Sequence, residues 1–258
     1  MSADPAGLAF DGVRFAYPGD ASGREVLAGV SFRVSPAERV AVLGPNGAGK
    51  TTLMLHLNGT LTPTAGTVSI AGAVVSRQNV REIRRRVGLV FQDPDDQLFM
   101  PTVGEDVAFG PANCGIRGGE LESRVAIALA QVGLHGAEHR YPQRLSLGER
   151  RRAAIATILA MDVEVVVLDE PTSNLDPSAR RALSATLSDL DSTVLVVTHD
   201  LPFALEVCQR SVVLNGGRIV ADGPTAELLG DAALMAAHGL ELPWGFDPAV
   251  AVRQRAQR

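Results

Sequence analysis

The chain has 258 residues, of which 46% are hydrophobic and 21% are charged. This composition excludes a disordered tail protein and a collagen-like protein, and the length is close to the size at which one hydrophobic core begins to divide. The net charge of −5 gives no basic field for collecting nucleic acid. We therefore expect no nucleic acid partner, and any polyphosphate must bind at a local site.

Cysteine content and hydropathy indicate the compartment. Cys114 and Cys208 lie far apart and show no pairing pattern, which fits a reducing environment. The longest apolar run near the middle, Ala153–Met161, is less than half of the ~20 residues that span a bilayer, and Met1–Ala9 lacks the basic start of a secretion signal. We expect a cytoplasmic chain that needs separate membrane-spanning partners for any role in transport.

The first third of the chain alternates strands with turns. Short β-like runs at Gly7–Ala16 and Gly29–Val34, separated by the turn-rich Tyr17–Asp20, predict a small antiparallel lobe. The apolar strand Arg39–Leu43 then runs into a glycine-rich turn and the helical segment Thr51–Leu57. Further strands are expected at Thr67–Ile70 and Val87–Phe91, and a basic helix at Val80–Arg86.

The pattern becomes helical between Asp93 and Met161. Helices are predicted at Val103–Phe109, Glu120–Val132 and Leu147–Met161. Strand patterns return at Glu164–Leu168, Thr193–Val197 and Ser211–Leu214, and an amphipathic helix is expected at Ser178–Leu190. Alternating strands and helices predict an α/β fold with a mainly parallel sheet, an antiparallel N-terminal lobe and a helical insert.

One eight-residue run has the spacing of a phosphate-binding loop. It consists of Gly44, Pro45, Asn46, Gly47, Ala48, Gly49, Lys50 and Thr51, which together match G-x-x-x-x-G-K-[ST]. The run follows a buried strand and opens a helix, as the motif requires. Its backbone N–H groups and the helix N-terminus can hold phosphates, Lys50 can reach the β- and γ-phosphates, and the Thr51 hydroxyl can coordinate Mg²⁺.

Two acidic residues end the strand at 164–168. Asp169 and Glu170 stand at the carboxyl end of a parallel strand, where open α/β sheets bind ligands. We expect Asp169 to hold the Mg²⁺ and Glu170 to orient or deprotonate the attacking water. His199 follows the next strand and reaches the same edge, although a lone histidine is more often an ordinary residue. These residues indicate hydrolysis of Mg-ATP or Mg-GTP.

The segment Leu145, Ser146, Leu147, Gly148 and Glu149 resembles the signature motif L-S-G-G-Q of ATP-binding-cassette ATPases. Leu147 stands where that family usually has glycine. The resemblance extends over about residues 8–229. It implies an ATPase domain at 1–230, made of a core at 1–92 and 163–230 with the helical insert at about 93–162, and a tail at 231–258. The residues of this tail themselves predict a helix and then a loop, with a solvated basic end at 253–258.

The resemblance also implies roles for single residues. Tyr17 matches the aromatic residue that stacks on adenine, Gln92 the glutamine that contacts Mg²⁺ and the attacking water, and His199 the switch histidine. Thr52 adjoins the phosphate loop and is included in the nucleotide site. The loop at the dimer seam is formed by Ser173, Asn174, Leu175 and Asp176. The implied cofactors are ATP and Mg²⁺.

Members of this family work in pairs, either of identical copies or of close paralogues. The resemblance implies that ATP on the phosphate loop of one subunit is covered by the signature loop of the other. The N-terminus of the helix from Leu147 supplies donors for that contact. Catalysis would rest on Glu170, His199 and Gln92.

Three segments are similar to the corresponding segments of energy-coupling-factor ATPases: Asp93–Val103, Glu105–Pro111 and the tail segment His238–Pro243. Within that group, the resemblance is to the cobalt and nickel importers. In those systems the ATPase pair sits at the cytoplasmic face of the cell membrane. It grips a transmembrane scaffold subunit, which holds a substrate-capturing membrane subunit. The resemblance places the expected gripping surface on the helical insert, near Gln97–Met100 and Thr102–Phe109. Leu98, Phe99 and Met100 would form an exposed apolar cluster there, and the alternative is that these three pack in the insert's own core.

Three alternatives remain beside this interpretation. One is a soluble cassette ATPase acting on nucleic acid or ribosomes, which the single cassette and the negative charge disfavour. Another is a kinase or GTPase using the same phosphate loop, which the signature motif disfavours. The third is a transporter ATPase for a vitamin, amino acid or drug, which this chain alone does not distinguish from a metal transporter.

Overall fold

A computed structural model describes residues 7–19 and 23–255. Its first layer is a sheet with the strand order β2-β1-β4-β5. The strands are β1 Leu8–Phe15, β2 Leu27–Val34, β4 Ala65–Ile70 and β5 Ala73–Val74. β1 pairs antiparallel with both β2 and β4. The predicted antiparallel lobe is therefore confirmed, and it includes the strand expected at 67–70.

The second sheet has the strand order β10-β9-β3-β8-β7-β6. Its strands are β3 Arg39–Leu43, β6 Val87–Val90, β7 Val165–Asp169, β8 Thr193–Val197, β9 Arg210–Asn215 and β10 Arg218–Pro224. Five strands are parallel, and β10 adds an antiparallel edge. The mainly parallel sheet is confirmed. Because parallel strands end at one edge, the loops after β3, β6, β7 and β8 meet there.

The central sheet separates two hydrophobic cores. In β3, Val40 and Val42 point into the core shared with the antiparallel lobe and α1 (Lys50–Leu57). Ala41 and Leu43 point into the other core, which is shared with the helical insert. Both faces of the strand are buried, and this explains its continuous apolar sequence. The phosphate loop is thus anchored by a strand that cannot shift register without exposing one of the two cores.

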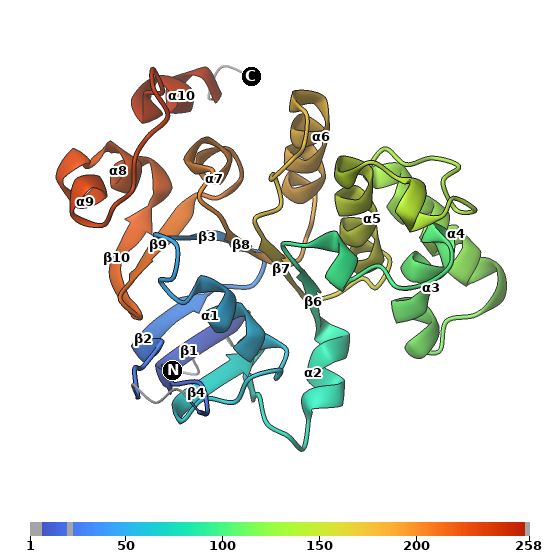
Figure 1. The fold of residues 1–258 in the computed structure, drawn as a ribbon, viewed down its shortest axis with the longest axis horizontal. Coiled ribbons are helices and arrows are strands. Elements are labelled where there is room, and N and C mark those ends of the chain that lie inside the picture. Colours follow the sequence, from blue (N-terminus) through green and yellow to red (C-terminus); the bar gives the residue numbers. More distant parts are fainter. Residues whose placement is uncertain (1–6, 20–22, 256–258) are drawn as a thin grey trace.

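The helical insert lies beside the β6 end of the sheet (Figure 1). Its main helices are α3 Val103–Asn113, α4 Gly118–Gln131 and α5 Leu147–Leu159, with short 3₁₀ turns at Pro94–Asp96 and Pro142–Arg144. Capping boxes begin α3 and α5, where a hydroxyl and the third-position glutamate exchange bonds with the backbone. The remaining helices of the core are α2 Val80–Arg86, α6 Pro177–Ser188 and α7 Leu201–Val207. Within the described ranges, no helix could cross a membrane.

The C-terminal region forms a small helical lobe on the β10 side of the sheet (Figure 1). It contains α8 Thr225–Gly230, α9 Ala232–Ala237 and α10 Pro248–Arg255. The expectation of a helix followed only by loop is wrong, because Asp247 accepts hydrogen bonds from the backbone N–H groups of Ala249 and Val250 and so starts α10. The helix continues to Arg255, and residues 256–258 of the basic end lie outside the described residues.

Candidate nucleotide site

The phosphate loop leaves β3 and enters α1 with a backbone that two glycines make possible. Gly44 and Gly49 both have positive φ angles, 154° and 102°. A Cβ atom on Gly44 would lie 2.1 Å from the backbone oxygen of Leu214, and one on Gly49 would lie 2.9 Å from that of Val26. Larger residues would therefore push the loop away from β9 and from the chain before β2. Ala48 is buried in the core beneath the loop.

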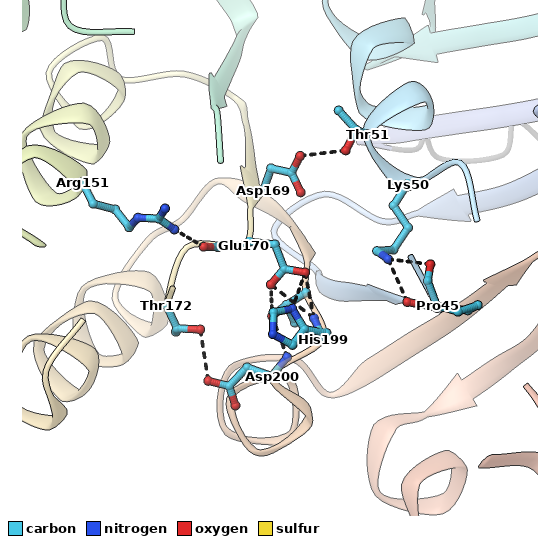
Figure 2. Close-up of polar contacts among 11 residues, drawn as sticks. Pro45, Lys50, Thr51, Arg151, Asp169, Glu170, Thr172, His199 and Asp200 are labelled. Carbon is cyan, nitrogen blue, oxygen red and sulfur yellow. Dashed lines mark hydrogen bonds and ion pairs between the residues drawn. The ribbon is translucent and has the colours of Figure 1, made fainter. Parts of the chain in front are cut away.

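Lys50 crosses the inside of this loop. Its ammonium donates hydrogen bonds to the backbone oxygens of Gly44 at 2.7 Å and Pro45 at 3.0 Å (Figure 2). Burial lowers the pKa of Lys50, and the charges of Glu170 and Asp169 act in the opposite direction. Lys50 is the only lysine in the sequence. The ammonium bonds two neutral carbonyl oxygens inside the loop, and a bound phosphate can replace them as its partner.

A cavity of about 610 Å³ opens over the loop. Its lining includes Gly44, Pro45, Asn46, Gly47, Gly49, Lys50, Thr51, Thr52, Gln92, Asp169, Glu170 and His199. The four strand-end loops thus contribute to one cavity, as the sequence predicted. Tyr17 is absent from this lining, but its hydroxyl lies 3.1 Å from the hydroxyl of Thr52, which belongs to the lining.

Oxygen donors suited to Mg²⁺ meet in this cavity. The Thr51 hydroxyl donates to the Asp169 carboxylate at 3.0 Å, and Gln92 lines the same space. Burial raises the pKa of Asp169, an effect that its bond from Thr51 opposes. Within the described residues, no group of three or more His, Cys, Asp or Glu could hold a metal. These three residues fit an Mg²⁺ that takes its remaining ligands from phosphates and water.

Glu170 is held in an uncommon backbone conformation with φ of 47°. Its carboxylate accepts hydrogen bonds from the Thr198 hydroxyl and the His199 backbone N–H, both at 3.1 Å. The His199 ring nitrogen Nδ1 lies 2.7 Å from the same carboxylate (Figure 2). Backbone strain at a buried, over-determined acid is typical of functional sites. The two residues predicted separately therefore form one unit.

Arg151 is a member of the site that sequence reasoning missed. It lies on α5, is only 3% exposed, and donates hydrogen bonds to the backbone oxygens of Glu170 and Gln92. Burial lowers the pKa of Arg151, and Asp93, Glu170 and Asp169 favour its charged form. The sequence shows Arg151 as the middle one of three consecutive arginines near the start of a helix, and nothing in that pattern reveals backbone carbonyls as its partners.

The signature loop begins α5 at a distance from the phosphate loop of the same chain. Ser146 accepts a hydrogen bond from the Glu149 backbone N–H, and the Glu149 carboxylate accepts from the Ser146 N–H. Arg140 lowers the pKa of Glu149 to about 2. Leu147 is exposed and lines a second cavity of about 500 Å³, which it shares with Gln92. Leu145, Ser146, Gly148 and Glu149 line neither cavity.

The expected seam loop runs from Ser173 to Asp176. Ser173 and Asn174 line the second cavity. Asp176 accepts hydrogen bonds from the backbone of Ser178 and Ala179 and so caps α6. Leu175 packs against the core of the insert. Asp176 therefore has a role as a helix cap within its own chain. Ser173 and Asn174, the other polar residues of the loop, face the second cavity.

The tail reaches the main cavity, which sequence reasoning did not foresee. Gly239, Leu240 and Glu241 form part of its wall. The segment is fastened at the end of β9, where Asn215 lies 3.0 Å from the His238 ring. Trp244, the only tryptophan of the chain, follows three residues later and is fully exposed. The C-terminal lobe therefore contacts the same space as the phosphate loop.

The apolar cluster predicted at residues 98–100 is only partly exposed. Leu98 is 7% exposed and packs in the core of the insert, so its assignment to an exposed surface is wrong. The outer aromatic surface is instead formed by Phe99, 63% exposed, and Phe109, 41% exposed, whose rings meet edge to face at 4.9 Å. Buried Asp106 accepts hydrogen bonds from the backbone N–H groups of Phe99 and Met100 and fixes this loop.

Comparison with known proteins gives consistent results. The family model described as ABC transporter matches residues 27–173. A candidate ABC transporter ATP-binding protein of Streptomyces coelicolor is 62% identical over 244 residues, covering 95% of this chain and 93% of that protein. The energy-coupling factor transporter ATP-binding protein EcfA of Carboxydothermus hydrogenoformans is 47% identical, with coverage of 90% and 86%.

Solved structures extend this similarity. CbiO1 from Clostridium perfringens, part of the ABC transporter complex cbiONQ, superposes with a TM-score of 0.78 at 30% identity and covers 97% of this chain and 99% of its own. A dimeric ATP-binding cassette bound to ADP and phosphate superposes with a TM-score of 0.79 at 26% identity, covering 84% of this chain and 98% of its own.

Proposed function

The chain belongs to the ABC transporter family of ATP-binding proteins, and from this premise we propose that it energises an energy-coupling-factor importer at the cytoplasmic face of the cell membrane. As a member of this family it binds ATP and hydrolyses it to drive transport. The observation that carries the proposal is the joining of Lys50, Asp169 and Glu170 in one cavity. The similarity to EcfA proteins supports the choice of importer type.

The residues of this chain suit an in-line attack of water on the γ-phosphorus. Lys50 and the N–H groups of its loop hold the phosphates. Mg²⁺ at Thr51 and Asp169, with Gln92 beside it, would neutralise charge on the β- and γ-phosphates. Glu170 accepts a proton from the water while the bond from the γ-phosphorus to the bridging oxygen breaks and ADP leaves. The contact with His199 keeps the carboxylate facing the cavity.

We propose that two copies pair head to tail over two ATP molecules. Ser146 and Gly148 line neither cavity of their own chain, and with the N-terminus of α5 they suit a contact with the γ-phosphate of a second copy. The similar cassette solved as a dimer with ADP and phosphate supports this arrangement. Tyr17 would contact the adenine at the mouth of the cavity, and Ser173 and Asn174 would lie at the seam.

The aromatic pair Phe99–Phe109 is the proposed contact with the transmembrane scaffold subunit. Two neighbouring exposed rings offer a hydrophobic anchor for a partner helix. Phe99 lies on the loop that follows Gln92, and Phe109 lies on α3, so nucleotide and partner can influence each other through the loop between Gln92 and Phe99. The scaffold would in turn hold the substrate-capturing subunit, and the likeness to CbiO1, which is part of the ABC transporter complex cbiONQ, supports a complex with further subunits.

We expect Phe99→Ala combined with Phe109→Ala to lower recovery of the scaffold subunit from membranes at least tenfold, because buried aromatic anchors dominate interfaces. The tagged chain is purified with its membrane partners, and the partners are identified by mass spectrometry. ATP hydrolysis by the isolated chain should change less than twofold. Ile127→Ala removes a similarly exposed apolar side chain from α4 and serves as the control. Equal recovery from the double variant and the control would contradict the assigned surface.

The cargo we propose is cobalt or nickel ions. Its support is the similarity of residues 93–111 and 238–243 to those importers and the structural likeness to CbiO1. Cells that express the whole transporter should accumulate radioactive cobalt or nickel at least tenfold above cells carrying Glu170→Gln. Uptake of a vitamin with no metal uptake would replace this cargo and leave the ATPase assignment intact.

A further inference from the structure

Helix α5 contacts two different places. Its first turn carries Ser146, which the proposed pairing puts against the nucleotide of the other copy. Arg151 lies on the same helix and donates to the backbone oxygen of Glu170 of its own chain (Figure 2). It also donates to the backbone oxygen of Gln92. Glu170 and Gln92 follow different strands, β7 and β6. One guanidinium therefore joins both loops that face the γ-phosphate to the helix that begins with the signature motif.

Other contacts fasten α5 to the loop after β6. Arg150 forms an ion pair with Asp95 at 3.0 Å. The Gln97 amide accepts from the Phe91 backbone N–H at 3.2 Å and donates to the Thr157 hydroxyl at 2.7 Å. These bonds hold the segment 91–97 against α5. Of the α5 residues named here, only Arg151 also donates to the Glu170 backbone. A displacement of α5 would therefore move the Glu170 backbone through Arg151, and with it the catalytic carboxylate.

The chemistry of the position favours arginine. Its planar fork can donate to two carbonyl oxygens at once, whereas a lysine ammonium presents a single point of charge. Asp93, Asp169 and Glu170 stabilise the positive charge despite its burial. The side chain does not reach the Glu170 carboxylate, which is bonded to Thr198 and His199 instead. Arg151 thus acts on where Glu170 stands, not on its proton.

We propose that Arg151 is a positioning residue that sets Glu170 and Gln92 of its own subunit according to the position of α5, so that covering the partner's nucleotide with Ser146 adjusts the catalytic residues in cis. This inference rests on the proposed roles of Glu170, Gln92 and Ser146. In each subunit, the α5 helix that covers the partner's nucleotide would also position the catalytic residues of its own subunit. The two ATP sites of a pair would be linked in this way.

Steady-state kinetics of the full chain gives the first test. Arg151→Met should lower kcat about 100-fold, the effect of a small misplacement of catalytic groups, with ATP affinity within threefold of the wild type. Arg151→Lys should lie between the two. Arg124→Met, on an exposed ion pair of α4, is the control. A folded Arg151→Met with kcat within twofold of the wild type overturns the inference, as does an equal loss of affinity. If that variant does not fold, Arg151→Lys decides by the same criteria.

Pairs of one Arg151→Met chain and one wild-type chain distinguish positioning in cis from general damage to α5. The two chains carry different tags, so that only mixed pairs are purified. In the first site, the catalytic residues belong to the Arg151→Met chain and should be misplaced. In the second site, they belong to the wild-type chain, whose own Ser146 still covers the nucleotide of its partner. The mixed pair should therefore keep about half of the wild-type kcat, whereas the pair of two Arg151→Met chains should show the full loss. A mixed pair with less than about a tenth of the wild-type kcat overturns the inference, because the change would then act on both sites. Failure of the two tagged chains to co-purify with ATP would overturn the head-to-tail pairing instead.

Discussion

Lys50→Ala should abolish ATP hydrolysis, lowering kcat by about 10²–10³-fold, the loss typical of one preorganised charged donor. Lys50 is the only charged donor inside the phosphate loop, and its ammonium now bonds two loop carbonyls that a phosphate can replace. Nucleotide affinity should fall as well, because a charge-assisted hydrogen bond contributes about 1.5–3 kcal/mol. The carbonyls of Gly44 and Pro45 would lose their donor, so the loop itself should become less ordered.

Trp244 provides the binding measurement. It is the only tryptophan, is fully exposed, and follows three residues after Glu241, which lines the cavity. Titration with a non-hydrolysed ATP analogue should change its fluorescence in the wild type and not in Lys50→Ala over the same concentration range. Arg181→Ala, which removes an exposed positive charge from α6, should behave as the wild type. Wild-type hydrolysis by a folded Lys50→Ala would refute the assigned cavity.

The absence of any second lysine offers an independent check on the same assignment. An amine-specific reagent can modify only Lys50 and the N-terminal amine of the chain. ATP should slow the modification of Lys50 while leaving that of the N-terminal amine unchanged, which makes the second amine an internal reference. Equal rates with and without ATP would show that the nucleotide does not cover this side chain.

The sequence predicted the fold because its strongest patterns are local. β3 is apolar from Val40 to Leu43 because both of its faces are buried, and the glycines after it fit one loop conformation. The carboxylates of Asp169 and Glu170 and the ring of His199 follow parallel strands, and the ends of such strands share an edge. Topology alone therefore brought these residues into one cavity, without knowledge of any side-chain contact.

Features that depend on tertiary contacts could not be predicted. The guanidinium of Arg151 binds backbone carbonyls, which leave no trace in the identity of their residues. Leu98 and Phe99 are adjacent and equally apolar, yet only the packing of the insert decides that one is buried and the other exposed. β10 has alternating exposure and polar residues, and only its pairing with β9 makes it a strand. The tail reaches the cavity because His238 contacts Asn215 and Leu240 packs in the core, and neither contact is visible in the sequence.

Glu170→Gln should lower kcat by about 10²–10⁴-fold, the range for loss of a positioned general base. The amide keeps the size of the side chain and can still accept hydrogen bonds from Thr198 and the His199 backbone, so the loop should hold its conformation. Lys50, Thr51 and Asp169 are untouched, and ATP affinity should stay within threefold of the wild type. A large loss of kcat with nearly unchanged ATP affinity is the result expected for a residue that acts on the attacking water.

The same variant should convert the protein into a stable pair when ATP is added. If ATP joins two copies and hydrolysis separates them, a chain that binds but does not hydrolyse ATP accumulates in the closed form. Size-exclusion chromatography with light scattering should show a dimer for Glu170→Gln with ATP and a monomer with ADP. Glu164→Gln makes the same change at the other end of β7, where the carboxylate pairs with Arg86, and should hydrolyse ATP normally. A Glu170→Gln chain that remains monomeric at saturating ATP would refute the head-to-tail pair, because Ser146 would then have no nucleotide to cover.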